Sequence, residues 1–227
     1  IIKIDDNTWR IEDGFVRFFV IEGKEKAILI DSGVDTPNAK EIAEGLTSKP
    51  LLLLNTHGDG DHVSGNGAFE TYYICEDDYL NLGLKDRFPN SKPIFLNDGN
   101  EIQLGDRLLR IVAIPGHTYG SVAVLDVNAR ALYVGDTIST AIIYMFGFRR
   151  SMQDYIQSLK KLDSMKDKFD VIYASHGTFE LKPDAINKVQ MDLEKALAGK
   201  LPTVDEELYG EPVTTHQGSF CGFYLPR

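Results

Sequence analysis

The first part of the chain alternates short apolar clusters with turn-forming Asp, Asn and Gly residues. Clusters rich in β-branched and aromatic residues, separated in this way, are typical of strands. A helix is then expected over 37–46, because Pro37 suits the first helical position and the apolar residues share one face. The leucine-rich run at 51–56 predicts a strand covered on both sides. The strands expected before the helix span 1–4, 8–11, 15–23 and 26–33.

The rest of the chain continues this mixture of strands and helices. Two amphipathic helices are predicted, one over 151–165 with Ser151 and Asp154 spaced as a capping box, and one over 183–198. A shorter helix is expected near 76–85, and the Pro-, Asn- and Gly-rich stretch after it is expected to be a loop. The remaining strands are expected at 72–76, 101–104, 107–116, 121–127, 131–136 and 169–175.

Two halves made mostly of strands with flanking helices favour an α/β fold in which two sheets pack face to face with helices outside. The length of 227 residues suits one large domain, 1–227, and no linker or repeat divides it. The apolar tail at 218–226 either completes a sheet or forms a homodimer contact, and the sequence leaves both open.

The charge and composition narrow the choice of partners. The formal net charge is −10, which disfavours nucleic acid and membrane surfaces and favours a small-molecule substrate. Neither a membrane helix nor a secretion signal is visible, and Cys75 and Cys221 do not suggest a disulfide framework. We therefore expect a cytoplasmic protein. Because the chain begins at Ile1 and not at Met, a removed targeting segment remains open.

Four predicted strands each lead directly into a side chain that can bind a metal. These side chains are His57, His117, Asp136 and His176. In layered α/β proteins the loops beyond the carboxyl ends of the strands converge along one edge, where ligands collect. We therefore expect the four side chains to meet at that edge.

The densest group of candidate ligands is THGDGDHVSGN, in which His57, Asp59, Asp61 and His62 stand within a few residues of one another. Residues two apart on a helix do not face each other, so a coil is expected, and the two intervening glycines are expected to permit it. Imidazole and carboxylate ligands suit Zn, Fe or Mn. So many ligands favour two divalent metal ions over one. The candidate metal ligands are His57, Asp59, Asp61, His62, His117, Asp136 and His176.

This pattern resembles the metallo-β-lactamase fold superfamily, whose signature is a His-x-His-x-Asp-His loop followed by a later His, Asp and His. The segments PGHTYGS and LYVGD look like those of glyoxalase II, and LIDSG looks like the family's early strand. The resemblance implies a four-layer αββα sandwich that holds two metals. It implies one metal at His57, Asp59 and His117, a second at Asp61, His62 and His176, Asp136 bridging the two, and Asp31 orienting a ligand.

The chain departs from the family at Asp59, where the family usually has its second histidine. A third carboxylate lowers the net charge of a two-metal core by about one unit, to roughly neutral. We therefore expect a weaker Lewis acid and a preference for iron or manganese over zinc. The flavodiiron proteins are similar in carrying a carboxylate at this position.

If the site holds two ions, we expect a bridging water, with its pKa lowered towards neutrality, to attack a carbonyl or phosphoryl group that one of the metals polarises. The expected activity is hydrolysis of an ester, thioester, lactone or similar bond of a small molecule, with Asp61 as the catalytic residue that orients the hydroxide. The alternative is a non-haem di-iron redox protein related to the flavodiiron oxidase domain. Asp59 favours this alternative, whereas the lack of a following flavodoxin-like domain speaks against it.

Several substrates known in the family are disfavoured. The helical C-terminal domain that binds glutathione in glyoxalase II has no full counterpart, so glutathione thioesters are not expected. True β-lactamases generally lack an Asp at the position of Asp136, and the acidic charge disfavours RNA.

Residues near the ligands allow two interpretations. The stretch 141–150 is expected to be core packing that leaves Arg149 and Arg150 in solvent, with a substrate wall and anion-binding arginines as the alternative. Tyr119 is expected to be partly buried, although its position also allows it to reach the site. His216 is expected to be a surface residue outside the site.

Overall fold

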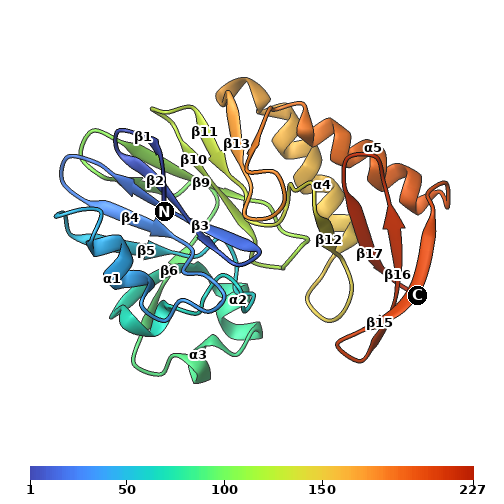
Figure 1. Cartoon of the computed structure of the whole chain (residues 1–227), viewed down its shortest axis with the longest axis horizontal. Helices are drawn as coiled ribbons and strands as arrows, with labels where there is room; N and C mark the ends of the chain where they lie inside the picture. Colours follow the sequence, from blue (N-terminus) through green and yellow to red (C-terminus); the bar gives the residue numbers. More distant parts are fainter.

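The computed structural model describes residues 1–227, whose strands form three sheets (Figure 1). In spatial order, the first sheet contains β1 (Ile2–Asp5), β2 (Thr8–Asp13), β3 (Val16–Glu22), β4 (Ala27–Ile30), β5 (Leu51–Leu54), β6 (Thr71–Cys75) and β7 (Lys92–Leu96). The second contains β14 (Glu180–Leu181), β13 (Val171–Tyr173), β11 (Ala131–Tyr133), β10 (Val122–Asp126), β9 (Leu108–Ala113) and β8 (Glu101–Gln103). The third contains β12 (Ile142–Tyr144), β17 (Gly222–Pro226), β16 (Glu211–Gln217) and β15 (Thr203–Leu208).

The helices lie on the outer faces of the two larger sheets (Figure 1). They are α1 (Ala39–Glu44), α2 (Glu76–Asn81), α3 (Leu84–Arg87), α4 (Met152–Ser164) and α5 (Ala185–Leu197), with short 3₁₀ turns at Asn66–Ala68 and Lys166–Lys168. None of these helices is both long enough and apolar enough to cross a membrane.

Side chains of β3 show how the layers form, because successive residues of a strand point to opposite faces. Phe19 and Ile21 pack in the core between the first and second sheets. Phe18 and Val20 belong to the core that the first sheet shares with α1 and α3. The other face of the second sheet packs with α4 and α5 in a third core. This arrangement confirms the predicted αββα sandwich.

The third sheet was not predicted as a separate layer. Its edge strand β12 pairs in parallel with β17, and the buried side chains Ile143 and Phe223 of these two strands share the core of α4 and α5. The C-terminal tail therefore completes a sheet within the chain. The hydrophobic pattern does not predict this sheet, because β12 has only three residues and β15 is exposed along almost its whole length.

Two local predictions in the middle of the chain were wrong. The helix expected over 76–85 is split into α2 and α3 by Gly83, whose φ of 67° no right-handed helix can contain. The stretch expected to be a loop contains β7, which pairs in parallel with β6 at the edge of the first sheet. Pro93 is tolerated there because an edge strand leaves one row of N–H positions unpaired.

The cap on α4 is confirmed, since Ser151 Oγ accepts a hydrogen bond from the Asp154 N–H at 3.2 Å.

Candidate metal centre

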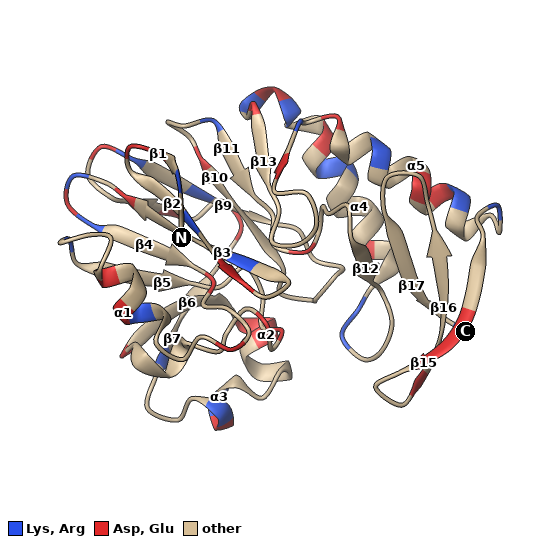
Figure 2. Ribbon diagram, in the orientation of Figure 1, with Lys and Arg blue, Asp and Glu red and all other residues tan.

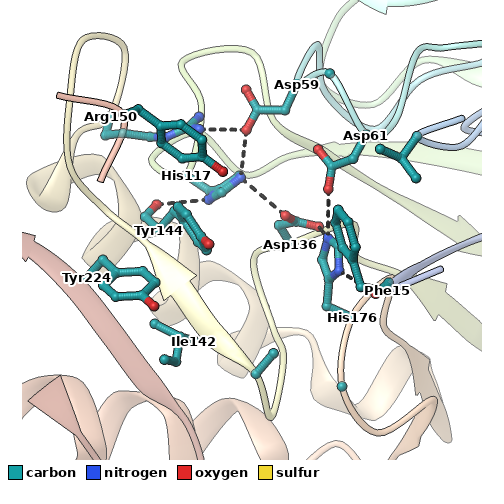
Figure 3. Close-up of a pocket in the computed structure, with 15 residues that line it drawn as sticks. Phe15, Asp59, Asp61, His117, Asp136, Ile142, Tyr144, Arg150, His176 and Tyr224 are labelled. Carbon is teal, nitrogen blue, oxygen red and sulfur yellow. Dashed lines mark hydrogen bonds and ion pairs between the residues drawn. The ribbon is translucent and has the colours of Figure 1, made fainter. Parts of the chain in front are cut away.

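Loops at one edge of the sandwich bring the predicted ligands together (Figure 3). The parallel strands β4 and β5 of the first sheet lead into Asp31 and His57, and the parallel strands β11 and β13 of the second sheet lead into Asp136 and His176. His117 follows β9. Parallel strands present their carboxyl ends at the same edge, which is why residues so distant in sequence meet.

The seven candidate ligands form two groups, within each of which the ligand atoms lie no more than 4.8 Å apart. Asp136 contacts both groups, one through each oxygen. Its Oδ1 lies 3.1 Å from Nε2 of His62 and 3.1 Å from Nε2 of His176. Its Oδ2 lies 4.0 Å from Nε2 of His57 and 3.5 Å from Nε2 of His117. We call His57, Asp59 and His117 the Asp59 group, and Asp61, His62, Asp136 and His176 the Asp136 group.

Hydrogen bonds fix the orientation of the imidazole rings. Nδ1 of His117 donates to the backbone carbonyl of Tyr144 at 3.1 Å, and Nδ1 of His176 donates to the carbonyl of Phe15 at 2.9 Å. A carbonyl oxygen only accepts, so in each neutral ring Nε2 carries the lone pair and faces the cluster. Such partners are typical of metal-binding histidines.

Asp31 orients the other two histidines. Its Oδ1 accepts the Thr56 N–H at 2.7 Å, and its Oδ2 accepts both the Thr56 hydroxyl at 2.8 Å and Nδ1 of His62 at 2.9 Å. Because the Thr56 hydroxyl gives its proton to Asp31, it accepts from Nδ1 of His57 at 3.0 Å. Asp31 is fully buried and has a left-handed φ of 62°, an uncommon conformation for a side-chain-bearing residue. These contacts are those expected of the predicted orienting role.

Buried atoms without partners show that the cluster fits divalent metals. Nε2 of His57, His62 and His117, and Oδ1 of Asp136, are buried and make no hydrogen bond. An unsatisfied buried polar group costs about 1–3 kcal/mol. Ligands about 2.1 Å from an ion lie about 3.0–4.2 Å from one another. The closest nitrogen–oxygen distances in the two groups, 3.1 Å and 3.3 Å, fall in this range.

The charges of the Asp136 group stabilise one another when no metal is bound. Burial opposes ionisation of Asp136, but His176 and His62 outweigh it and hold the pKa of Asp136 well below its usual value. Burial lowers the pKa of His176, but the carboxylates of Asp136 and Asp61 together outweigh burial and raise the pKa of His176 to about 10. Burial also lowers the pKa of His62, but the carboxylates of Asp136, Asp31 and Asp61 together outweigh burial and raise the pKa of His62 well above its usual value. Metal-free protein therefore holds protons at these rings.

Arg150 belongs to the site, which corrects the interpretation that both arginines after β12 are solvated. Its Nη2 donates to Oδ2 of Asp59 at 2.6 Å, and its side chain is only 15% exposed. Burial opposes ionisation of Asp59, but His117, His57 and Arg150 together hold the pKa of Asp59 well below its usual value. Arg150 therefore supplies a positive charge that offsets the extra carboxylate. No spacing in the sequence indicates this contact.

Asp78 is a second residue that sequence reasoning missed. It is buried in α2, where its Oδ2 accepts the Gly58 N–H at 2.8 Å and the Thr118 hydroxyl at 2.8 Å. Its Oδ1 accepts the Gly120 N–H at 2.8 Å. Asp78 thereby ties the loop of the first ligands to the loop of His117. Its neighbour in the acidic start of the helix is exposed, and the sequence does not distinguish the two.

The glycines of the ligand loop act differently from the expectation. Neither Gly58 nor Gly60 has a positive φ, so neither is needed for backbone freedom. Gly58 is needed for space, because a Cβ there would lie 2.6 Å from a methyl carbon of Leu82. At Gly60 the nearest atom to such a Cβ is a nitrogen of Arg87 at 3.8 Å, so a side chain fits there.

A cavity of about 970 Å³ opens onto the cluster. Ile142, Tyr144 and Tyr224 of the third sheet line the side opposite the ligand loops, and Phe15 lines the near side (Figure 3). Tyr209, in the turn between β15 and β16, also lines the cavity. The stretch after Asp136 therefore forms a wall of this cavity as well as packing in the core, as the alternative interpretation expected.

Two residues considered from the sequence lie outside the site. Tyr119 is 39% exposed and does not line the cavity. His216 is absent from both ligand groups, and it lies half-buried within β16 instead of on a surface turn.

The fold and the cluster define an αββα protein with a two-part metal-ligand site. The model of the metallo-β-lactamase superfamily matches residues 11–176, a range that contains all seven candidate ligands. The chain belongs to the metallo-β-lactamase superfamily.

Solved structures agree with this fold. A metallo-β-lactamase from Pontibacter korlensis aligns with a TM-score of 0.70 at 18% identity, covering 85% of this chain and 97% of that protein. A metallo-β-lactamase family protein from Thermus thermophilus aligns with a TM-score of 0.69 at 17% identity, covering 88% of this chain and 85% of that protein. At these identities the likeness shows the fold alone.

Curated relatives are named hydroxyacylglutathione hydrolases. The protein of Methylococcus capsulatus is 30% identical over 74% of this chain, and that of Nostoc punctiforme is 26% identical over 69% of it. The chain spans 64% and 62% of the lengths of these two relatives. The family match and the names of the relatives support a metal-dependent hydrolase.

Proposed function

We propose that the chain is a binuclear metal-dependent hydrolase that cleaves an ester, thioester, lactone or similar bond of a small molecule. The observation that carries the proposal is the position of Asp136 between two sets of imidazoles, with each oxygen facing a different set. Together with the unpartnered Nε2 atoms, this geometry supports a pair of ions that share one carboxylate.

The side chains of the cluster have separate roles in the proposed reaction. The Asp59 group and the Asp136 group would each hold one ion. When bound, divalent ions polarise a carbonyl oxygen and lower the pKa of water towards neutrality. Asp61 lines the cavity, with its Oδ2 3.3 Å from Nε2 of His176, and its carboxylate orients the attacking water and accepts its proton. Asp31 keeps His62 and His57 in the required tautomer.

The curated relatives support a thioester as one candidate substrate. Their name describes hydrolysis of hydroxyacyl thioesters of glutathione. We include the thioester bond in the proposal on that ground.

Metal content is the first measurement that tests the proposal. Protein purified without added metal is analysed by plasma mass spectrometry and assayed against neutral esters, thioesters and lactones. About two ions per chain, with hydrolysis that is lost on chelation and restored by the metal found, is the expected result. Fewer than two ions in protein that hydrolyses at full rate contradicts the binuclear proposal.

A redox function is the second candidate, because Asp59 places a third carboxylate oxygen in the cluster, 3.3 Å from Nε2 of His117. Iron as the bound metal, with oxygen consumption in the presence of a reductant and no ester hydrolysis, favours this candidate. The charge of Arg150 beside Asp59 weakens the argument that the third carboxylate by itself selects iron or manganese.

A further inference from the structure

The cavity is apolar and aromatic on the side away from the candidate ligands. We propose that it binds an uncharged ester, thioester or lactone whose acyl part is aromatic or apolar, and that it disfavours substrates with carboxylates far from the scissile bond. This inference rests on the proposed hydrolase function and names the substrate class for the same site.

The third sheet supplies the floor of this apolar side. Tyr144 of β12 and Tyr224 of β17 are paired neighbours in parallel strands, and their rings meet edge to face with centroids 4.8 Å apart. Ile142 lies two residues earlier on the same face of β12, and all three line the cavity (Figure 3). Aromatic edges and branched methyl groups provide a surface for an apolar acyl group.

Two hairpin turns add aromatic rings at the rim. Phe15 stands in the turn between β2 and β3, and Tyr209 stands in the turn between β15 and β16. Both line the cavity, yet Phe15 is 67% exposed and Tyr209 is 87% exposed. Large apolar side chains left in water at the mouth of a cavity mark a surface that a ligand covers. The ring of Phe15 also stacks on His176 at 5.9 Å, which places this rim next to the ligand cluster.

The same cavity offers no free cation to a substrate. Apart from the histidines, Arg150 is the single basic residue among those that line it. Its Nη2 is paired with Asp59, and its Nη1, although it makes no hydrogen bond, is enclosed by protein atoms. A distant carboxylate of a substrate would lose its hydration here without gaining an ion pair, which is unfavourable. In Figure 2 the loop after β12 has a basic segment, and β15 at the far edge of the same sheet has an acidic one.

A matched pair of esters tests the inference. Metal-loaded protein is assayed with para-nitrophenyl butyrate and para-nitrophenyl hemisuccinate, which share a leaving group and differ in the charge of the acyl end. We expect kcat/KM to be at least about tenfold higher for the butyrate. Tyr209→Ala and Tyr224→Ala should raise KM for the butyrate by about fivefold to tenfold, with kcat and metal content little changed.

Control variants distinguish a loss of contact with the substrate from a general disturbance of the fold. Tyr224→Phe keeps the ring and should remain close to the wild-type protein. Phe148→Ala removes an aromatic side chain that is 74% exposed but does not line the cavity, and it should leave KM unchanged. An equal or higher rate with the hemisuccinate, or a KM unmoved by both tyrosine variants, overturns the inference while leaving the hydrolase proposal intact.

A binding measurement covers the case in which neither ester is cleaved. That result counts against the proposed hydrolysis of such bonds, and the wall is then tested by calorimetry with the uncleaved neutral amide butyranilide. Binding that is weakened at least about fivefold by Tyr224→Ala supports the apolar wall. No binding, or binding indifferent to both Tyr224→Ala and Tyr209→Ala, overturns the inference.

Discussion

Arg150 binds the oxygen of Asp59 that faces the histidines of its group. Nη2 of Arg150 lies 2.6 Å from Oδ2 of Asp59, and the same oxygen lies 3.3 Å from Nε2 of His117. The carboxylates of the Asp136 group, Asp61 and Asp136, pair with histidines alone. The positive charge beside Asp59 is therefore a guanidinium that stays when metal binds, whereas the charges that balance Asp61 and Asp136 are ring protons that metal binding releases.

This asymmetry predicts unequal metal binding. The first divalent ion should enter the Asp136 group, and the second should bind the Asp59 group more weakly because Arg150 repels it and competes for Asp59. Arg150→Gln should strengthen the weaker step by about tenfold. Calorimetric titration of metal-free protein measures both steps, and Arg149→Gln is the neighbouring control. Two equal steps that Arg150→Gln leaves unchanged would contradict the prediction.

Asp61 should matter more for turnover than for metal retention. Asp61→Asn keeps the shape of the side chain but removes its charge and its ability to accept a proton, so kcat should fall by about a hundredfold or more. His62, Asp136 and His176 remain in place, so metal content should stay close to that of the wild-type protein. Rates and metal analysis on the same samples check this. An unaffected rate rules out the proposed role of Asp61.

Metal binding should release protons at neutral pH. His176, whose pKa is raised to about 10 in the metal-free protein, and His62, whose pKa is also raised, are protonated at pH 7 and must lose these protons to bind metal. Apparent metal affinity should therefore rise with pH up to about 10. Calorimetry in two buffers with different ionisation enthalpies should count about two protons released. A count near zero would show that these rings are already neutral.

The raised pKa of His176 also has a consequence for the stability of metal-free protein. A histidine whose pKa is higher in the folded state contributes stability that is fully present below its unfolded pKa of about 6.5. That contribution is lost as pH rises through the folded value of about 10. Chelated protein should therefore unfold at a lower denaturant concentration at pH 9.5 than at pH 7. Metal-loaded protein should not show the same loss, because its ligands are already deprotonated.

Removing the carboxylate of Asp78 should separate the two loops that it joins. Asp78→Ala leaves three donors without their acceptor, and we expect the free energy of unfolding to fall by about 3 kcal/mol or more. Metal should be lost first from the Asp59 group, whose His57 and His117 are in these loops. Asp77→Ala is the matched control, since Asp77 is exposed in the same turn. Denaturant unfolding and metal analysis of both variants test the prediction.

The sequence predicts the ligand cluster well because strand periodicity and ligand position depend on local residues. A recognisable apolar run precedes each of His57, His117, Asp136 and His176. The sheets then place the loops that follow these strands at one edge of the sandwich. The contact of Arg150 with Asp59 joins residues 91 apart, and no periodicity encodes it. The distinction of Asp78 from Asp77 likewise depends on how α2 packs, which is settled only when the loops are folded around it.

The candidate metal ligands and most of the aromatic residues that line the cavity come from different parts of the chain. Every candidate ligand lies within the range 11–176 that matches the family, whereas Tyr209 and Tyr224 come after it. Tyr144 lies within the range, but it holds His117 through its backbone carbonyl, so its ring can be exchanged without releasing that histidine. Substitutions in the C-terminal strands can therefore change the substrate preference of the protein during evolution while the metal ligands stay the same.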